Sequence, residues 1–192
     1  MTILTTARLR LEPQVEAHLD GLNAVNADPE VMRYVTGQPE TREETLAGIR
    51  RVQQRWADVG YSWFAFVERD TGEVIGSGCL QNLRRELVAN PDPGAPLELG
   101  WRLRQDRWGR GLASEAAEAL AAFAFDQHGA QEVYAVCEPE NVASSRVMER
   151  LGMHALGLQR WYGREMATYA ISAAQWRDGQ AARDARASAR QA

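Results

Sequence analysis

The sequence has no lysine, and all 22 of its basic side chains are arginines. This absence excludes a kinase-type phosphate loop, which needs a lysine after its last glycine. We attribute the missing lysine mainly to codon usage in a GC-rich genome. The formal net charge is −4, so the chain lacks the basic excess that nucleic-acid-binding proteins carry, and we expect no nucleic-acid partner.

Long apolar runs are also missing. The segment Met1 to Leu11 is too polar for a signal peptide, and no stretch approaches the roughly 20 apolar residues that span a bilayer. The two cysteines, Cys79 and Cys137, lie far apart in expected strands, which favours reduced core thiols over a disulfide or a nucleophile. We therefore expect a cytoplasmic protein with no membrane partner.

Histidine is scarce as well, and no metal is expected. His18, His128 and His154 are scattered and have no partners at the spacing of metal ligands. We expect these histidines to be structural or to lie on the surface. Neither a Ser-His-Asp nor a Cys-His arrangement indicates covalent catalysis.

The length of 192 residues suits one domain, because it is too short for two ordinary ones. We assign residues 1–178 to this domain and expect the Ala/Arg-rich tail, residues 179–192, to be frayed. The first half predicts a strand near Arg8–Leu11, followed by one or two short helices between Val15 and Val35 that are broken at Asp28-Pro29. A helix is then expected from the Thr41/Glu44 capping box to Gly60. A hairpin of Tyr61–Arg69 and Val74–Leu83 follows, and then a mobile loop over residues 84–96.

The second half alternates strands and helices. It predicts a strand over Leu97–Leu103, an alanine-rich helix over Leu112–His128, a strand over Gln131–Cys137, a helix over Asn141–Leu151, a hairpin of Met153–Trp161 and Glu165–Ile171, and a short last helix capped by Ser172. In the Leu97–Leu103 strand the leucines face one way, while Glu98, Gly100 and Arg102 face the other. The pattern predicts an α/β or α+β fold with mixed strand directions.

The strongest local signal is the glycine turn from Trp108 to Ser114, between the strand and the alanine-rich helix. Glycines allow close approach of a ligand to the backbone, and the helix start offers free N–H groups and the positive end of its dipole. A phosphate or pyrophosphate suits such a place. A tight strand-to-helix connection without a ligand explains the turn equally well.

The turn also comes close to a dinucleotide-binding pattern. Gly109-x-Gly111-x-x-Ser114 has serine at the third glycine, and Glu138 after the next strand is a candidate for the ribose-binding acid. Against this interpretation, the preceding strand is amphipathic, whereas such folds bury continuous apolar strands. The turn lies in mid-chain, and too few residues follow it for the remaining parallel strands.

Several segments together resemble one family, and their order and spacing carry the likeness. They are Thr6–Leu9, Asp28–Tyr34, Thr41–Glu44, Glu68–Gly76, Leu97–Trp101, the glycine turn, Asn141–Ser144 and Glu149–Met153. Between Thr6 and Trp176 the chain resembles the GNAT superfamily of acetyl-CoA-dependent N-acetyltransferases, in its ribosomal-protein-acetyltransferase-like branch. The resemblance implies an α/β (α+β) fold with a mixed, mostly antiparallel sheet of about seven strands. It also implies flanking helices and a sheet splayed at the cofactor site.

The resemblance also implies how acetyl-CoA binds. In the loop pattern of the family, Gly111 and Ala113 match the last two fixed positions, and Trp108 replaces the usual arginine or glutamine, a departure common in this branch. Backbone amides of Gly109, Arg110, Gly111, Leu112, Ala113 and Ser114 would hold the pyrophosphate. The pantetheine arm would pair with backbone near Trp101, Arg102 and Leu103 as a surrogate strand, and Asn141 would hydrogen-bond it.

Acetyl transfer to an amine needs a base and a proton source for the leaving thiolate. Glu98 is the base candidate, since burial would raise its pKa; a glutamate paired with a neighbouring arginine is the alternative. Many members of the superfamily have a tyrosine as the general acid at the position where this chain has Met148. The resemblance therefore points instead to Ser144 as the proton donor to the thiolate, and Tyr134 is a weaker candidate. Both hydroxyls also have purely structural explanations. Four aromatic residues either line an acceptor pocket or belong to the core, namely Tyr34, Trp63, Trp161 and Tyr162.

Three functions remain open on the sequence. The first is direct transfer of acetyl from acetyl-CoA, in a ternary complex, to a protein N-terminus, an amino acid or a small amine. The second is a non-catalytic acyl-CoA-binding regulatory or interaction module, and the third is a dinucleotide-binding protein. A homodimer through the final strands is compatible with the sequence.

Overall fold

The computed structural model describes residues 2–86 and 92–189, with the backbone alone for residues 183–189. One eight-stranded sheet has the order β1-β2-β3-β4-β5-β6-β8-β7. Its strands are β1 (Leu4–Thr5), β2 (Leu9–Pro13), β3 (Trp63–Glu68), β4 (Val74–Asn82), β5 (Leu97–Leu103), β6 (Glu132–Cys137), β7 (His154–Trp161) and β8 (Arg164–Ser172). Neighbours are antiparallel except β5 and β6, so the expected mixed, mostly antiparallel sheet is confirmed.

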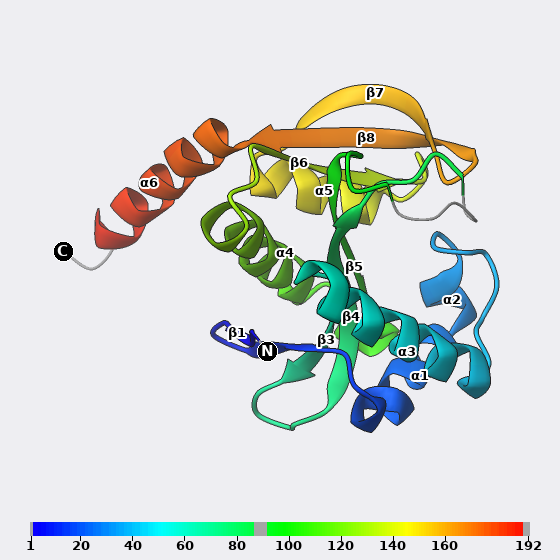
Figure 1. Cartoon of the computed structure of the whole chain (residues 1–192). Helices are drawn as coiled ribbons and strands as arrows, with labels where there is room; N and C mark the ends of the chain where they lie inside the picture. The colour runs from blue at the N-terminus through cyan, green and yellow to red at the C-terminus, as the bar shows by residue number, and fades with distance from the viewer. Residues whose placement is uncertain (1, 87–91, 190–192) are drawn as a thin grey trace.

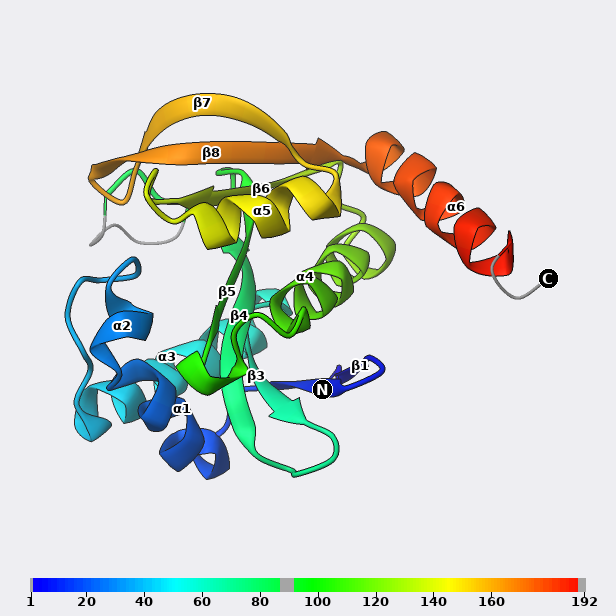
Figure 2. The same ribbon diagram turned by 180° about the vertical axis from the view of Figure 1, so that it is seen from behind.

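Helices cover both faces of the sheet (Figures 1 and 2). They are η1 (Glu16–His18), α1 (Leu19–Asn26), α2 (Pro29–Met32), α3 (Arg42–Val59), η2 (Gln105–Arg107), α4 (Leu112–Ala122), η3 (Phe123–Gln127), α5 (Val142–Leu151) and α6 (Ala173–Ala189). The capping box of α3 is confirmed, because Thr41 Oγ1 accepts from Glu44 N at 3.2 Å and Glu44 Oε2 accepts from Thr41 N at 2.8 Å. Gly60 ends this helix at φ 78°.

The two faces of the sheet follow from strand alternation. Leu99 and Leu103 of β5 join the main core with Leu120 of α4. On the opposite face, Ala65 of β3 packs with residues of α1 and α3, including Ile49. The predicted split of β5 into a leucine face and a polar face is therefore confirmed, and the polar face lies under α1 and α3.

Some expected boundaries differ from the observed ones. The alanine-rich helix changes at Phe123 from α4 to the π-helix η3. The last helix was expected to be short, with a frayed tail from Gly179, but α6 continues to Ala189. Residues 87–91 of the predicted mobile loop lie outside the described residues. Within the described ranges, no helix has the length and apolar character that a membrane span requires.

Close packing between β4 and its neighbours fixes the middle of the sheet. A Cβ at Gly78 would lie 2.4 Å from Phe66 Cζ and 2.6 Å from the Gly100 carbonyl oxygen. We expect Gly78→Ala to lower the free energy of unfolding by about 1–3 kcal/mol, because the site is already filled. Urea denaturation measures the change.

A second glycine provides the matched control. Gly48 lies inside α3, and a Cβ there would meet only Arg51 Nη2, at 3.8 Å. Gly48→Ala is expected to raise the free energy of unfolding by about 1 kcal/mol through helix propensity. Equal effects of the two substitutions would contradict the packing at Gly78.

Candidate active site

The parallel pair β5 and β6 separates soon after it forms. The two strands pair only at Leu97 with Val133 and at Glu98 with Tyr134, while β5 pairs with β4 along its whole length. In an antiparallel pair, the N–H and C=O of every second residue point to the partner strand. Because Arg104 N donates to Ile75 O, the backbone groups of Arg102 also point to β4, whereas those of Trp101 point away from it. The N–H and C=O of Trp101 therefore face the gap between β5 and β6.

At the far end of β5, the glycine turn leads into α4. Gly109 and Gly111 have φ values of 72° and 75°, which favour glycine. Gly111 is the N-cap residue of α4, and no side chain caps the free N–H groups at this end of the helix. Among the described residues, no acceptor is found for the N–H groups of Gly109 to Ser114. Trp108 Nε1 donates to Leu103 O at 2.8 Å and so fastens the turn to the strand. The turn presents a row of free donors at a helix start.

The start of α5 lies on the β6 side of the gap. Asn141 is its N-cap, and its Oδ1 accepts from Ser144 N at 3.2 Å. This contact uses the amide oxygen of Asn141 and leaves its Nδ2 without a hydrogen-bond partner among the described residues. Asn141 and Ser144 both line the cavity described next.

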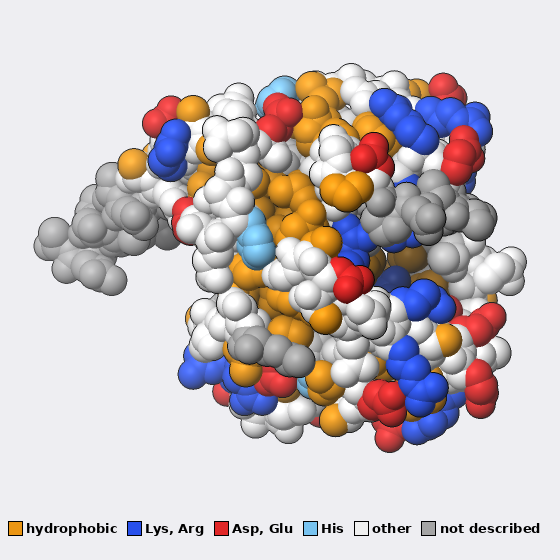
Figure 3. Space-filling model, viewed as in Figure 1, with side chains coloured by type: hydrophobic (Ala, Val, Ile, Leu, Met, Phe, Trp, Pro, Cys, Tyr) orange, Lys and Arg blue, Asp and Glu red, His pale blue; other side chains and the backbone are white. Residues whose placement is uncertain are grey.

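A cavity of about 480 Å³ opens between the polar face of β5, helices α1 and α3, and the β6 side of the gap. Its wall includes Glu98, Trp101, Arg102, Asn141 and Ser144, which joins residues from both sides of the gap. Figure 3 shows basic side chains around and inside a hollow in this part of the surface. The volume is in the range of sites for small molecules.

Glu98 is the buried carboxyl of this cavity, with only 6% of its surface exposed. Gln81 Nε2 donates to Glu98 Oε2 at 2.9 Å, and the hydroxyl of Tyr162 donates to the same oxygen. Burial raises the pKa of Glu98 above its usual value, although both hydrogen bonds and the charge of Arg84 lower it. Glu98 makes no ion pair with any arginine in the described chain, so the paired alternative is wrong.

The hairpin between β7 and β8 brings Tyr162 to Glu98. Trp161 pairs with Arg164, so the turn holds two residues, Tyr162 at φ 52° and Gly163 at φ 76°. Two positive φ values are typical of a type I′ turn, and holding a tyrosine there costs about 1–2 kcal/mol. Tyr162 N and Gly163 N donate to the carbonyls of residues 84 and 85, which holds the turn over the cavity. Burial and the Glu98 carboxyl raise the pKa of Tyr162, so its hydroxyl keeps its proton.

The sequence-predicted residues fall into two groups. Glu98, Trp101, Arg102, Asn141 and Ser144 meet in the cavity. The glycine turn, from Trp108 to Ser114, is not part of the cavity wall and lies at the other end of the β5 strand. The side chain of Arg102 lies in the cavity with its guanidinium 4.8 Å from the Trp63 ring.

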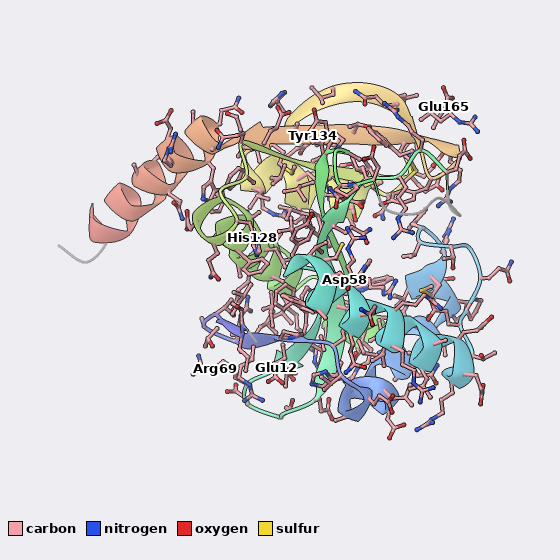
Figure 4. The ribbon with its side chains drawn as sticks, viewed as in Figure 1. Glu12, Asp58, Arg69, His128, Tyr134 and Glu165 are labelled. Atoms are coloured by element: carbon pink, nitrogen blue, oxygen red, sulfur yellow. The ribbon has the colours of Figure 1, made fainter. Side chains whose placement is uncertain are left out.

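The aromatic candidates separate in the same way. Tyr34, Trp63 and Tyr162 line the cavity, which is the first of the two alternatives left open by the sequence. Trp161 is buried in a separate cluster under Arg85, so the core alternative holds for this residue. Tyr134 lies on β6 (Figure 4) and packs against that cluster. It is not part of the cavity wall.

The cysteine and histidine expectations are also resolved. Cys79 and Cys137 are free and buried, as predicted. His128 packs between the Tyr61 and Phe123 rings, and burial lowers its pKa. His18 lies 3.3 Å from Glu12. His128 is not part of the cavity wall, and Figure 4 shows it at the end of the α4 region.

Three residues of the cavity wall were not predicted from the sequence, namely Gln81, Arg55 and Arg84. Gln81 lies opposite Glu98 in the β4–β5 pairing, and its Oε1 accepts from Trp63 Nε1 at 3.0 Å. Gln81 and Glu98 meet only because of the register of β4 and β5. The loop between these two strands is too long for the sequence to predict that register. Arg55 and Arg84 also line the cavity, from α3 and from the segment after β4.

Comparison with known proteins agrees with this geometry. The Acetyltransferase (GNAT) domain family matches residues 8–154. Uncharacterized protein YkkB of Bacillus subtilis is 31% identical, over 88% of this chain and 94% of its own. The FsC-acetyl coenzyme A-N(2)-transacetylase of Aspergillus fumigatus is 32% identical, over 78% of this chain and 64% of its own.

A solved structure gives the same result. The crystal structure of an acetyltransferase from Agrobacterium tumefaciens superposes with a TM-score of 0.73 at 27% identity, over 89% of this chain and 94% of that one. The sheet order, the gap between β5 and β6 and the glycine turn thus occur in a chain that belongs to the GNAT acetyltransferase family.

Proposed function

We propose that the protein is an N-acetyltransferase that moves an acetyl group from acetyl-CoA directly to an amine in a ternary complex. The observation that carries this proposal is the placement of Glu98. A buried carboxyl with a raised pKa lies in the wall of the cavity, at the point where β5 and β6 begin to separate. A general base of this kind suits the removal of a proton from an amine.

The residues around the gap fit acetyl-CoA. The free N–H groups from Gly109 to Ser114 suit the pyrophosphate, because a helix start favours negative charge. The unpaired backbone of Trp101 suits the amides of pantetheine, which can pair with a strand edge. Asn141 Nδ2 is a further donor toward this arm. Arg102 turns its backbone to β4, so we assign it to the cavity and not to cofactor pairing.

Bound acetyl-CoA would supply an acetyl thioester, and the chain would supply the proton transfers. Glu98 accepts the proton of the amine, directly or through water, while the amine nitrogen forms a bond to the acetyl carbon and the carbon–sulfur bond breaks. Ser144 is proposed as the donor to the leaving sulfur, because it lines the same cavity from α5. Tyr162 and Gln81 hold Glu98 in place through their hydrogen bonds.

The fold argues against one of the two alternative functions and is compatible with the other. A dinucleotide site needs a parallel sheet, whereas only β5 and β6 are parallel among the described strands. A non-catalytic acyl-CoA-binding module has the same fold and is separated by activity alone. We keep the ribosomal-protein-acetyltransferase-like branch as a proposal that rests on Trp108 in the loop.

The pH profile tests the role of Glu98. We expect Glu98→Gln to lower kcat by about 10²–10⁴-fold with little change in acetyl-CoA affinity, because it removes a general base. In the wild type, kcat/KM should fall as the pH drops through the raised pKa of Glu98. Tyr162→Phe removes a hydrogen bond that lowers this pKa, so its acidic limb should move to higher pH. Release of coenzyme A over a pH series gives both results.

Thermal unfolding is the control for Glu98→Gln. A folded-state pKa above the unfolded value means that the native state binds more protons, so Glu98 weakens the fold as the pH rises through this window. Glu98→Gln should therefore raise Tm at pH 8 more than at pH 4. Unchanged turnover in this folded variant would rule out the base assignment.

Asn141 variants separate a helix cap from a cofactor contact. Asn141→Ala should weaken acetyl-CoA binding and also cost about 1 kcal/mol of stability, since it removes the cap of α5. Asn141→Asp keeps a capping oxygen but loses the Nδ2 donor, so it should weaken acetyl-CoA binding with the stability retained. Calorimetry with acetyl-CoA and urea denaturation measure the two effects. Wild-type affinity in both variants would count against this pocket.

A further inference from the structure

Three arginines of the cavity have no partner for their charge. Arg55 comes from α3, Arg84 from the segment after β4 and Arg102 from β5. Each has a buried Nε with no hydrogen-bond partner, and Arg55 Nη1 has none either. Within residues 2–86 and 92–189, none of the three forms an ion pair, whereas arginines elsewhere, such as Arg8 and Arg107, pair with carboxylates.

The two carboxyls of the cavity make no ion pair with these arginines in the described chain, although the charge of Glu40 raises the pKa of Arg102 and the charge of Arg84 lowers the pKa of Glu98. Glu40 Oε2 accepts from Asn26 Nδ2 at 2.9 Å and from Thr45 Oγ1 at 3.1 Å. Glu98 is likewise held by neutral donors, Gln81 and Tyr162. Both acids are therefore bonded to uncharged groups. Among the described residues, the one hydrogen bond of the three guanidiniums also goes to a neutral group, from Arg55 Nη2 to Asn82 Oδ1 at 2.8 Å.

The three arginines are only partly exposed to water, and Arg84 lies near enough to Arg55 for their like charges to interact. Burial lowers the pKa of Arg55, and the like charge of Arg84 lowers it further, although Tyr61 opposes this. Burial likewise lowers the pKa of Arg102, whose guanidinium stacks over the Trp63 ring. Unpaired buried charge is costly, and an oxyanion bound by a planar guanidinium fork removes much of that cost.

We propose that the amine acceptor is a small molecule that also carries an oxyanion, a carboxylate or a phosphate-type group, held by Arg55, Arg84 and Arg102. The amine of the acceptor then lies at Glu98. Glu98 and Arg102 are on the same face of β5, with Gly100 between them on that face. The cavity of about 480 Å³ must also admit the acetyl group, which favours an acceptor of amino-acid size. This inference rests on the proposed acetyl transfer and names its substrate class.

Matched pairs of acceptors test the proposal. Release of coenzyme A from acetyl-CoA is measured with each common amino acid and its carboxamide, and with 2-aminoethylphosphonate and ethanolamine. We expect the anionic member of the best pair to have at least about tenfold higher kcat/KM, the size of effect that a buried charge pair gives. The carboxamide has the less basic amine, so ease of deprotonation alone would favour the neutral member. The phosphonate pair distinguishes the two kinds of oxyanion.

Arginine variants assign the effect to the cavity. Arg102→Gln and Arg55→Gln should lower kcat/KM for the anionic acceptor about tenfold, mainly through KM, and change the neutral partner less than about twofold. Arg102→Lys should restore part of the loss, because it keeps the charge without the fork. Arg84 is left out, since its charge also lowers the pKa of Glu98. Arg50→Gln is the control, because Arg50 lies exposed on α3 in an ion pair with Glu16.

The outcomes separate the inference from the proposed function. Transfer to neutral amines as fast as to anionic ones overturns the inference and leaves the acetyltransferase proposal intact. Equal loss on both members of a pair in Arg102→Gln overturns it as well. If a variant fails to fold by circular dichroism, the wild-type ratio alone decides. No transfer to any amine, together with no stabilisation by acetyl-CoA, overturns both.

Discussion

The separation of β5 from β6 is the constraint on which the rest of the site depends. Parallel pairing holds at Leu97 and Glu98 and then stops, although both strands continue and pair with their other neighbours. A buried strand edge without a partner leaves backbone donors and acceptors unpaired, which is costly unless a ligand or water satisfies them. The gap therefore defines a place for an amide-bearing chain that can pair with the strand edge at Trp101.

Glu98 stands where this gap begins, and its environment is assembled from distant parts of the chain. Gln81 comes from the neighbouring strand and Tyr162 from the hairpin that closes over the cavity. The positive φ of Tyr162 is a local cost that the hairpin contacts offset. Burial and these hydrogen bonds act in opposite directions on the pKa of Glu98, so the protein tunes a base while keeping it ordered.

Much of this arrangement follows from the sequence. The capping box at Thr41, the glycine ends of helices and the alternation of β5 predicted the elements and the face of Glu98. The resemblance to acetyltransferases implied the mixed, mostly antiparallel sheet and its splaying at the cofactor site. The contacts of Gln81 and the lack of ion pairs at Arg55 and Arg84 in the described chain could not be predicted, because they depend on strand register and on which charges find partners. The sequence left open whether Trp161 lies in the core or in the cavity, because an aromatic residue in a hairpin has the same pattern in both cases.

Amide hydrogen exchange at Trp101 tests the central claim most directly. Its N–H faces the gap, whereas the N–H of Arg102 faces β4 and serves as an internal control. We predict that acetyl-CoA slows exchange at Trp101, that NAD does not, and that Arg102 changes little. Stabilisation of the protein by acetyl-CoA with unchanged exchange at Trp101 would contradict the account, because the cofactor would then bind outside the gap.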